Sequence, residues 1–501
     1  MPNFPDNPPN QSTVVFNGIT YTYNGNSWDG TVTTTNSSTA GVASIIAGNG
    51  INVSPDTGGG ATGTVTIKSL QGDAKLIDTL LPSTQDPEDD NLNWYDYFEH
   101  IGDNGGTWIL PNRKYTVSGS DPIIFKEKGT KLMGETSGIR PTIKIDIPSS
   151  ISAPTYNGDT AVIPCGFWFA NKTRIRGLNI EWQNPDDHTN HALLLFQKAV
   201  VEVSVTNAGN LKVESQADMD SSVDDCALTC RANLNTAGAG IITYLGRNMR
   251  VTGCTFASGE GSGDMRCISL SYAKQSTHSH TSTSNTVFDD NDGQSAATGG
   301  FRKNIVRDNT FHMTKDSVCV ELFVATDTPL NNNHIYGLQI TNNQNDVGGN
   351  LLRCSANSRS IGTVISGNVV FRGNVPGILV SNAARVISMV VTGNFFGGTD
   401  TDSSNVSNNH GNWIQVDSGS TFQRCTITGN TFRRPTDACI YFNTGVNRIT
   451  ITGNTFDKDD RNSVPAIRVN GGSGVIVANT SNCDTFFTDA GSGTWTQTAN
   501  L

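Results

Sequence analysis

A six-residue motif recurs through the second half of this chain and constrains its fold more than any other feature. Its cleanest copies read ITGNTF, at 427–432 and again at 451–456. The looser copies begin at Val251, Val306, Ile340, Ile365 and Val391, and a degenerate one begins at Val477. Four of the seven intervals between successive copies lie within one residue of 25. A repeat of this length indicates a solenoid of stacked coils.

The residue types in the motif indicate that each coil is built from strands. Ile, Thr and Val favour strands because their branched side chains suit a pleated surface, and the apolar residue is expected to point inward. Gly429 and Gly453 permit a corner with positive φ, and an asparagine follows each of them. In stacked coils these asparagines would form an amide ladder. Its members would be Asn309, Asn343, Asn368, Asn394, Asn430 and Asn454.

A second strand is expected at a nearly constant distance after each motif. Apolar residues spaced by two, such as Val320 and Leu322 or Ile440 and Phe442, predict inward positions. The residues between these pairs form one outward column: Ser269, Glu321, Arg353, Leu379, Gln415, Tyr441 and Arg468. No helical periodicity competes in this region. The sequence therefore predicts an all-β parallel β-helix with coils about 4.8 Å apart.

Composition limits the classes of partner. The chain has 501 residues, a net charge of −11 and a pI near 5.2, so a nucleic-acid partner is not expected, because phosphate contacts need Lys and Arg. The sequence shows no signal peptide and no apolar run long enough to span a membrane. We therefore expect no membrane partner, and we expect the chain to assemble in a cytoplasm. The ten cysteines lack metal-type spacing and are expected to be buried, reduced thiols.

The N-terminal part differs in character from the coils. Hairpin signals and a polar linker fill 1–40, Gly-punctuated strands fill 41–70, and 71–147 contains a predicted helix over 92–102 with entry strands. The helix rests on apolar residues at i, i+3, i+4 and i+7, and it would cover the exposed core of the first coil. Coils are predicted over 148–485 and a short tail over 486–501.

Several segments resemble known families. The GDA at 72–74, the helix at 92–102, GGTWILPNRKYTV at 105–117 and TKLMGE at 130–135 resemble the start of the pectate-lyase-superfamily β-helices common in phage tailspikes. That family usually opens with GDGxTDDT, whereas here the acidic run is displaced to 86–90. Residues 41–70 resemble a segment of trimeric phage tail fibres, and 12–30 resemble small modules of marine-phage structural proteins.

The resemblance implies a bacteriophage tailspike or tail fibre protein with a single-stranded right-handed parallel β-helix. Its implied partners are two further copies in a homotrimer, a phage tail or virion adaptor protein bound through the N-terminus, and host surface polysaccharide. The implied location is the virion tail, after assembly in the host cytoplasm. No cofactor is implied.

Insertions occupy one slot of the repeat, between the motif and the second strand. They cover 257–264, 397–412 and 457–464, and all are polar and acid-rich. Because they share a slot, they are expected at one edge of the solenoid, where repeat proteins commonly place binding loops. Acidic, hydroxyl-bearing loops suit hydroxyl-rich ligands such as glycans.

Carboxylates near this edge are the candidate catalytic groups. If Leu228 aligns with Ile268, Asp225 lies one coil before Asp264, and Glu321 lies one coil after it. Carboxylates on adjacent coils would be about 5–10 Å apart, which is the range of glycosidase acid pairs. Glu321 is the predicted protonated acid and Asp264 the base, with Asp225 as the third candidate. The predicted ligand-binding residues are Asp224, Glu260, Arg266, Arg353 and Tyr441.

Other chemistries remain open. A lyase would need a base such as Arg266, Lys315 or Arg353 beside an acidic sugar. The run 224–226 resembles the acidic motif of polygalacturonase-type β-helices, but that family's Gly-His-Gly and Arg-Ile-Lys motifs are absent. The histidine pairs His278/His280 and His188/His191 are expected to be loop residues without a metal.

Three functional hypotheses follow. The first is a tailspike that binds host polysaccharide and also cleaves it, as a glycoside hydrolase or polysaccharide lyase. The second is a non-enzymatic virion fibre or adhesin of the same fold. The third is a stand-alone polysaccharide lyase or hydrolase, which the fibre-like N-terminus disfavours.

Overall fold

The computed structural model divides the chain into two compact units, residues 1–72 and 73–501. In the first unit it describes the backbone of 13–16, 19–23, 28–32, 51–55 and 65–69. In the second it describes 74–501 except 128, 136–138, 147, 149, 157–158, 162, 184–190, 198, 200–219, 231–239, 246–247, 259–264, 272–303, 314–316, 324–334, 347–348, 356–357, 372–374, 398–411, 436 and 459–463.

The first unit contains two small antiparallel sheets. Strands β1 (Thr13–Phe16), β2 (Ile19–Tyr23) and β3 (Trp28–Val32) form one, and β4 (Ile51–Pro55) pairs with β5 (Val65–Ser69) in the other. Phe16 of β1 pairs antiparallel with Ile19 of β2, as expected from the hairpin predicted at Asn17-Gly18.

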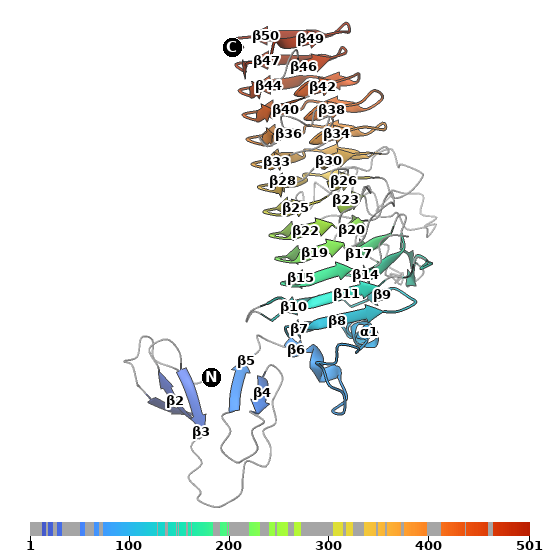
Figure 1. Ribbon diagram of the computed structural model, residues 1–501, viewed down its shortest axis with the longest axis vertical. Coiled ribbons are helices and arrows are strands. Elements are labelled where there is room, and N and C mark those ends of the chain that lie inside the picture. The colour runs from blue at the N-terminus through green and yellow to red at the C-terminus, as the bar shows by residue number, and fades with distance from the viewer. Residues whose placement is uncertain are drawn as a thin grey trace, which may run out of the picture. The chain divides into compact units, whose positions relative to one another are not determined.

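The second unit is a parallel β-helix, as predicted, and its strands stack one coil above another (Figure 1). Its first sheet has fourteen strands: β6 (Ala74–Leu76), β7 (Thr107–Leu110), β10 (Thr130–Gly134), β15 (Thr173–Arg176), β18 (Ser222–Asp224), β21 (Arg250–Thr252), β24 (Ile305–Arg307), β28 (Gln339–Thr341), β32 (Val364–Ser366), β36 (Val390–Thr392), β40 (Thr426–Thr428), β44 (Ile449–Thr452), β47 (Ser473–Val477) and β50 (Thr494–Thr498).

Two further sheets of twelve strands complete each coil. The second sheet contains β8 (Lys114–Ser118), β11 (Thr142–Asp146), β16 (Asn179–Trp182), β19 (Ala227–Cys230), β22 (Thr255–Ser258), β25 (Thr310–His312), β29 (Gln344–Asn345), β33 (Val369–Phe371), β37 (Phe395–Gly397), β41 (Thr431–Arg433), β45 (Thr455–Asp457) and β48 (Thr480–Ser481). The third contains β9 (Ile123–Phe125), β14 (Cys165–Phe169), β17 (Ala192–Gln197), β20 (Gly240–Leu245), β23 (Arg266–Ser271), β26 (Val318–Leu322), β30 (Asn350–Cys354), β34 (Ile378–Val380), β38 (Ile414–Val416), β42 (Ile440–Phe442), β46 (Pro465–Val469) and β49 (Thr485–Asp489).

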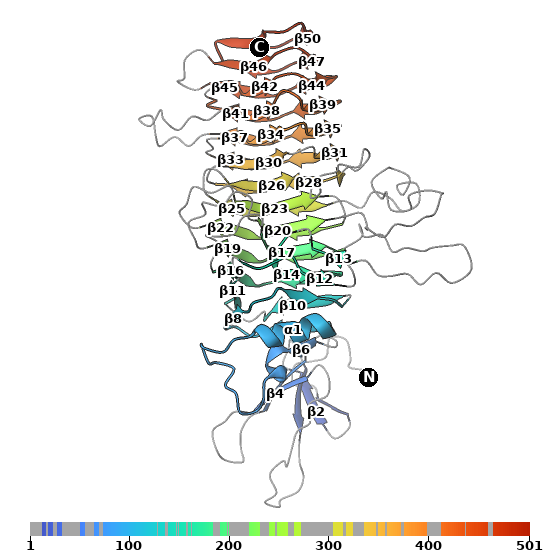
Figure 2. The ribbon, with the colours of Figure 1, turned by 90° about the vertical axis from the view of Figure 1, so that its right-hand side faces the viewer.

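The chain visits the sheets in a fixed order in every coil, first to second to third. A short fourth sheet joins five of the coils between the third and first sheets: β27 (Ile335–Tyr336), β31 (Arg359–Ile361), β35 (Arg385–Ile387), β39 (Thr421–Gln423) and β43 (Val446–Asn447). A small hairpin of β12 (Thr155–Tyr156) and β13 (Asp159–Thr160) lies in the connection between β11 and β14. Figure 2 looks onto the third sheet, from β14 up to β46.

The helix α1 (Tyr95–Asn104) covers the first coil, close to the predicted range of 92–102 (Figure 2). A short 3₁₀ helix, η1 (Ile77–Leu80), precedes it. Phe98 and Ile101 are fully buried, and the Phe98 ring lies 5.6 Å from that of Phe167 in the next coil of the third sheet. The backbone N–H of Lys126 donates to Gly102 O and joins the helix to the end of β9. No helix in the described part of the chain is long and apolar enough to cross a membrane.

The recurring motif forms the corner between the first and second sheets. Ile427 pairs with Val391 on one side and with Ile451 on the other, so equivalent positions of the motif stack in register. Gly429 and Gly453 both have a φ of 63°, the left-handed conformation that the motif needs between its two strands.

Register also corrects the motif count. Ile476, not Val477, pairs with Ile451, so the last degenerate copy begins one residue earlier than predicted. Two further copies were missed because neither has the Gly-Asn pair: Leu178 follows Gly177 in the first, and Asp225-Cys226 replaces the pair in the second. Ile175 and Val223 occupy the first position of IRGLNI and VDDCAL, and both pair in register with the later copies.

The predicted asparagine ladder is confirmed. Each side-chain Nδ2 donates to the Oδ1 of the next asparagine over 2.8–3.1 Å, and each backbone N–H donates to the same oxygen. The ladder continues two coils beyond the predicted members, and it comprises Asn309, Asn343, Asn368, Asn394, Asn430, Asn454, Asn479 and Asn500. Cys254 and Cys226 hold the equivalent places below it. The ladder satisfies buried backbone groups that a turn would otherwise leave unpaired.

The core lies inside the coils, where aromatic rings also stack. The ring centroids of Phe396, Phe432 and Phe456 are 5.2 and 5.3 Å apart and the rings are nearly parallel. All ten cysteines are free thiols, nine of them buried and Cys483 partly exposed, as expected for a chain without disulfides. The coils extend beyond the expected limits of 148–485. They begin with β7 to β9, and the tail 486–501 contributes β49 and β50 to the last turn.

Candidate functional site

The outward face of the third sheet carries a column in which the residue type changes at every coil. Strand register confirms the predicted order of its members, each paired with the next: Ser269, Glu321, Arg353, Leu379, Gln415, Tyr441 and Arg468. The residues on either side of each member, such as Val320 and Leu322, are buried in the core. A strand alternates its side chains, so the column faces away from that core.

Long connections leave both edges of this sheet. The insertions at 257–264, 397–412 and 457–464 join strands of the second sheet to strands of the third, which places all three in one slot as predicted. On the other edge, long connections follow β17, β23 and β26 before the chain reaches the next strand. The third sheet is therefore the face that the sequence flanks with variable segments, a pattern that repeat proteins use for binding.

Glu321 is the buried centre of a charged network in this column. Its side chain is 1% exposed, and it lies between Arg266 of β23 and Arg353 of β30. Arg266 Nε is 2.5 Å from Glu321 Oε2, and Arg353 Nε donates to Glu321 Oε1 over 2.9 Å. Ser355 Oγ donates to the same Oε1 over 2.8 Å. The carboxylate is thus held on both oxygens by groups from neighbouring coils.

Glu321 is placed to orient the two arginines, because one of its oxygens faces Arg266 and the other faces Arg353 and Ser355. The acid role predicted for Glu321 stays a prediction. The alternation of inward and outward positions on β26 predicted its direction but not these partners.

The structure places Asp224 and Asp225 elsewhere. Leu228 pairs with Phe256 in the second sheet, so the predicted alignment of Leu228 with Ile268 is wrong. Asp225 instead occupies the corner position of the motif, with a φ of 53°, and it pairs with Arg140. Asp224 accepts a hydrogen bond from Ser222 Oγ over 2.7 Å. Both aspartates lie at the corner of the first and second sheets, and Glu321 lies on the third.

Three predicted residues cannot be placed in this arrangement. Asp264, Glu260 and Lys315 lie outside the described residues. The pairing of Glu321 with Asp264 stays a prediction from the sequence.

Tyr441 and Arg468 form a half-buried aromatic and cationic pair, two and three coils above Leu379. The Arg468 guanidinium lies 5.1 Å from the centroid of the Tyr441 ring, and Arg468 also pairs with Asp437. Asn470 Nδ2 donates to the Tyr441 hydroxyl over 3.1 Å. A half-buried ring with a stacked guanidinium offers an apolar face together with several donors. Sequence spacing found Tyr441, but Asp437 and Asn470 needed the fold.

Gln415 lies between the two ends of the column. Its Oε1 accepts from Asn412 Nδ2 over 3.0 Å, and its Nε2 donates to Asp417 Oδ1 over 2.8 Å. The side chains from Glu321 to Arg468 form a strip that is polar except at Leu379. On a rung spacing of about 4.8 Å the strip is about 24 Å long, which suits an extended ligand better than a compact one.

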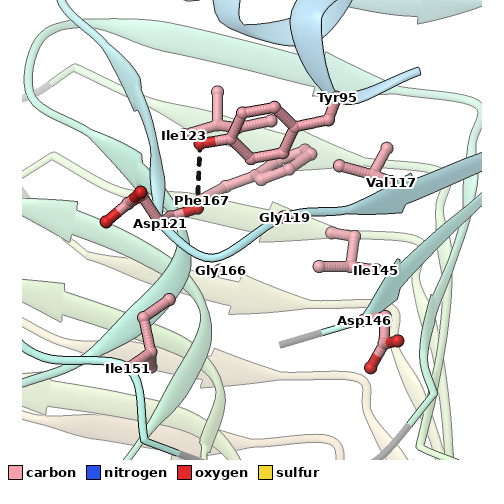
Figure 3. A pocket seen from close by; sticks show the side chains of 10 residues that line it. All are labelled: Tyr95, Val117, Gly119, Asp121, Ile123, Ile145, Asp146, Ile151, Gly166 and Phe167. Carbon is pink, nitrogen blue, oxygen red and sulfur yellow. Dashed lines mark hydrogen bonds between the residues drawn. The ribbon is translucent and has the colours of Figure 1, made fainter. Parts of the chain in front are cut away.

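A small pocket lies in the N-terminal coils, away from this strip. Tyr95 of α1 covers it, and its hydroxyl donates to the Asp121 carbonyl over 3.1 Å (Figure 3). Ile123, Ile145 and Phe167 also line it. The space is about 10 Å³, room for about one water molecule and too little for a sugar ring.

The expected absence of a metal rests partly on residues outside the described set. Among the residues that are described, no group of three or more His, Cys, Asp or Glu side chains could hold a metal ion. His191 is 7% exposed and precedes β17. His188, His278 and His280 lie in segments that the structure does not describe.

Comparison by sequence finds no relatives for this chain. No protein-family model matches it, and no curated protein matches it.

Comparison by structure finds several β-helix proteins. The A-module of the Azotobacter vinelandii mannuronan C-5 epimerase AlgE4 aligns over 84% of this chain and 99% of its own, with a TM-score of 0.53 and 12% identity. Tailspike protein 3 of bacteriophage CBA120 aligns over 95% of this chain and 73% of its own, with a TM-score of 0.45 and 11% identity. A tailspike mutant of E. coli bacteriophage HK620, in complex with a pentasaccharide, covers 90% and 82%, with a TM-score of 0.43 and 11% identity. At these identities the likeness is one of fold.

Proposed function

We propose that this protein is a phage tailspike or tail fibre subunit that binds host surface polysaccharide along the outer strip of the third sheet. The observation that carries the proposal is the strip itself, a line of varied polar and aromatic side chains from Glu321 to Arg468. Hydroxyl-rich chains are recognised by such side chains, with apolar ring faces against aromatic ones and hydroxyls against amides and charges.

Two features support a role on a virion. The module-like segment at 12–30 and the fibre-like segment at 41–70 precede the β-helix in the sequence, and the first unit is a separate compact body that contains small sheets. We assign to it the attachment to a phage tail or virion adaptor, and we assign homotrimer formation to the whole chain. Native mass measurement tests the assembly, because a trimer has three times the 53.4 kDa of one chain.

The proposal requires binding, and cleavage is a separate prediction. Glu321 is engaged with Arg266 and Arg353. Catalysis by Glu321, Asp264 and Asp225 stays a prediction. New reducing ends or unsaturated sugars after incubation with a bound glycan would establish turnover, and their loss in Glu321→Gln or Asp264→Asn would assign it to these residues.

The binding test uses the full-length protein and a panel of purified bacterial surface polysaccharides. The proposal expects saturable binding to at least one of them, weakened in Arg468→Gln and unchanged in Arg385→Gln, which alters an exposed arginine of the fourth sheet. Binding that survives Arg468→Gln and is lost in Arg385→Gln would place the glycan on another face and contradict the proposal.

A further inference from the structure

The outward face of the first sheet concentrates positive charge in its N-terminal coils. Strand register aligns the outward positions of β10, β15, β18, β21 and β24 in two columns. Five of these ten positions hold a cation and one holds a carboxylate, a net charge of +4 in a chain whose total is −11. The ten are Lys131, Met133, Arg174, Arg176, Ser222, Asp224, Arg250, Thr252, Ile305 and Arg307. This part of the face is therefore opposite in charge to the chain as a whole.

The later coils of the same face carry no charge. The fourteen outward positions on the strands from β28 to β50 are Val, Thr or Ser, apart from one glutamine. They are Gln339, Thr341, Val364, Ser366, Val390, Thr392, Thr426, Thr428, Thr450, Thr452, Val475, Val477, Thr496 and Thr498. Both halves belong to one continuous parallel sheet, so the fold does not require cations on this face.

Four of the cations form a group without acidic partners, called here the basic patch: Lys131, Arg174, Arg176 and Arg250. Within the described residues, none of these four side chains makes an ion pair or a hydrogen bond. The three arginines are exposed, and Lys131 is half-buried. Lys131 pairs directly with Arg174 on the next coil, where two like charges repel. The stability of the folded chain therefore does not account for the basic patch.

The carboxylates of this face are engaged elsewhere. Asp224 accepts a hydrogen bond from Ser222 Oγ over 2.7 Å. Asp308 follows β24 and lies 3.0 Å from Arg307 Nε. The four cations of the basic patch are thus left for an anion from outside the chain.

We propose that the basic patch binds a chain of acidic polysaccharide. Guanidinium groups bind carboxylates through paired N–H groups, and three exposed arginines on this face offer such pairs. This is a second binding face, separate from the strip on the third sheet, and it goes beyond the proposed function.

The shape of the face favours a single extended chain. The two columns are about 7 Å apart and span five coils, or about 19 Å. An extended polysaccharide can follow so narrow a ribbon. A bilayer or a DNA duplex is wider and would also meet the remaining surface of a chain with a net charge of −11, which repels it.

The test measures binding of polygalacturonate to the full-length protein by calorimetric titration at low ionic strength. The matched neutral probe is its methyl ester, which has the same backbone without the charges. Saturable binding of polygalacturonate is expected, with none of the ester, and it should weaken as salt screens the exposed charges.

Paired variants assign the binding to the basic patch. Arg174→Gln with Arg176→Gln is expected to weaken it about tenfold, and Arg250→Gln about threefold. The control is Arg385→Gln with Arg448→Gln, which removes the same charge from exposed arginines elsewhere and is expected to leave binding unchanged. The altered side chains are exposed, so the unfolding midpoint should not change. If the first double variant does not fold, Arg250→Gln decides.

Several results would overturn the inference. The first three are no saturable binding of polygalacturonate, equal binding of the acid and its ester, and equal weakening by the two double variants. Binding of phosphatidylglycerol vesicles or duplex DNA that depends on Arg174 and Arg176, without binding of polygalacturonate, would assign the patch to another class of partner. A smaller assembled mass of the patch variant would instead place the patch between copies of the chain.

Discussion

Two columns run along this β-helix, and they obey opposite rules. Inside the corner of the first and second sheets, the same residue, asparagine, recurs from Asn309 to Asn500. On the outside of the third sheet, the residue changes from serine to glutamate, arginine, leucine, glutamine, tyrosine and arginine. From Asn309 to Asn500 the inner column satisfies the same backbone groups in each coil, so one side chain suits these coils. The outer column has no such task, which leaves it available for a ligand whose groups differ along its length.

The largest effect is expected from breaking the inner column. Asn430 Oδ1 accepts from both nitrogens of Asn394, and its Nδ2 donates to Val391 O and Asn454 Oδ1. Asn430→Ala leaves several buried groups unpaired and is expected to lower the free energy of unfolding by about 3 kcal/mol. Denaturant-induced unfolding measures it. The control is Thr431→Ala, on the outward side of the next strand, with about 0.5 kcal/mol expected. If Asn430→Ala and Thr431→Ala lower the free energy of unfolding equally, the inner column does not carry the stability assigned to it.

A smaller loss is expected where the outer column is buried. Glu321→Leu leaves Arg266 and Arg353 without their shared carboxylate and is expected to cost about 2 kcal/mol. The full cost of an unpaired buried charge is not expected, because both guanidinium groups reach solvent. The same unfolding measurement applies, with Gln415→Leu as a control in the exposed part of the column. If Glu321→Leu leaves the free energy of unfolding unchanged, the carboxylate does not hold the two arginines.

The exposed part of the outer column is expected to affect binding alone. Tyr441→Ala should weaken binding to the recognised polysaccharide about tenfold, or about 1.4 kcal/mol, with no change in the unfolding midpoint. Tyr336→Ala is the matched control, since Tyr336 is a half-buried tyrosine of the fourth sheet. Equal losses in the two variants would show that the binding face is not the third sheet.

The smallest effect concerns a single thiol near the last coil. A hydrogen bond with the Cys439 thiol lowers the pKa of Cys483 to about 7, against the opposing effect of burial. The other thiols described are buried, and burial raises the pKa of Cys165 and Cys319. A thiol-alkylating reagent should therefore modify Cys483 first. Its rate should be high above pH 7, where the thiolate dominates, and fall as the pH drops through that value. Peptide mass mapping at pH 6 and pH 8 checks both the order in which the cysteines react and the pH dependence of the rate. Equal labelling of Cys483 and a buried cysteine would contradict the prediction.

Sequence predicts the inner column well because its signal is repetition. Asn394 and Asn430 each follow a glycine in a recognisable motif, and the period alone places them on one line. The copy at Val223 escapes that logic, since Asp225 replaces the corner glycine and Cys226 the asparagine. The wrong alignment of Leu228 followed directly from that missed copy.

The outer column is predictable only in part. Alternation along each strand gives the direction of Glu321 and Tyr441. Their partners depend on which strands are neighbours and in what register, as with Arg266 one coil before Glu321.

The central claim is that recognition belongs to the outer strip of the third sheet. A density map of the protein with a bound fragment of its polysaccharide tests this most directly. The account predicts sugar rings along the strip, with one of them against the Tyr441 ring. Sugar bound at the pocket beneath Tyr95, or on the first or second sheet with the strip empty, would contradict it.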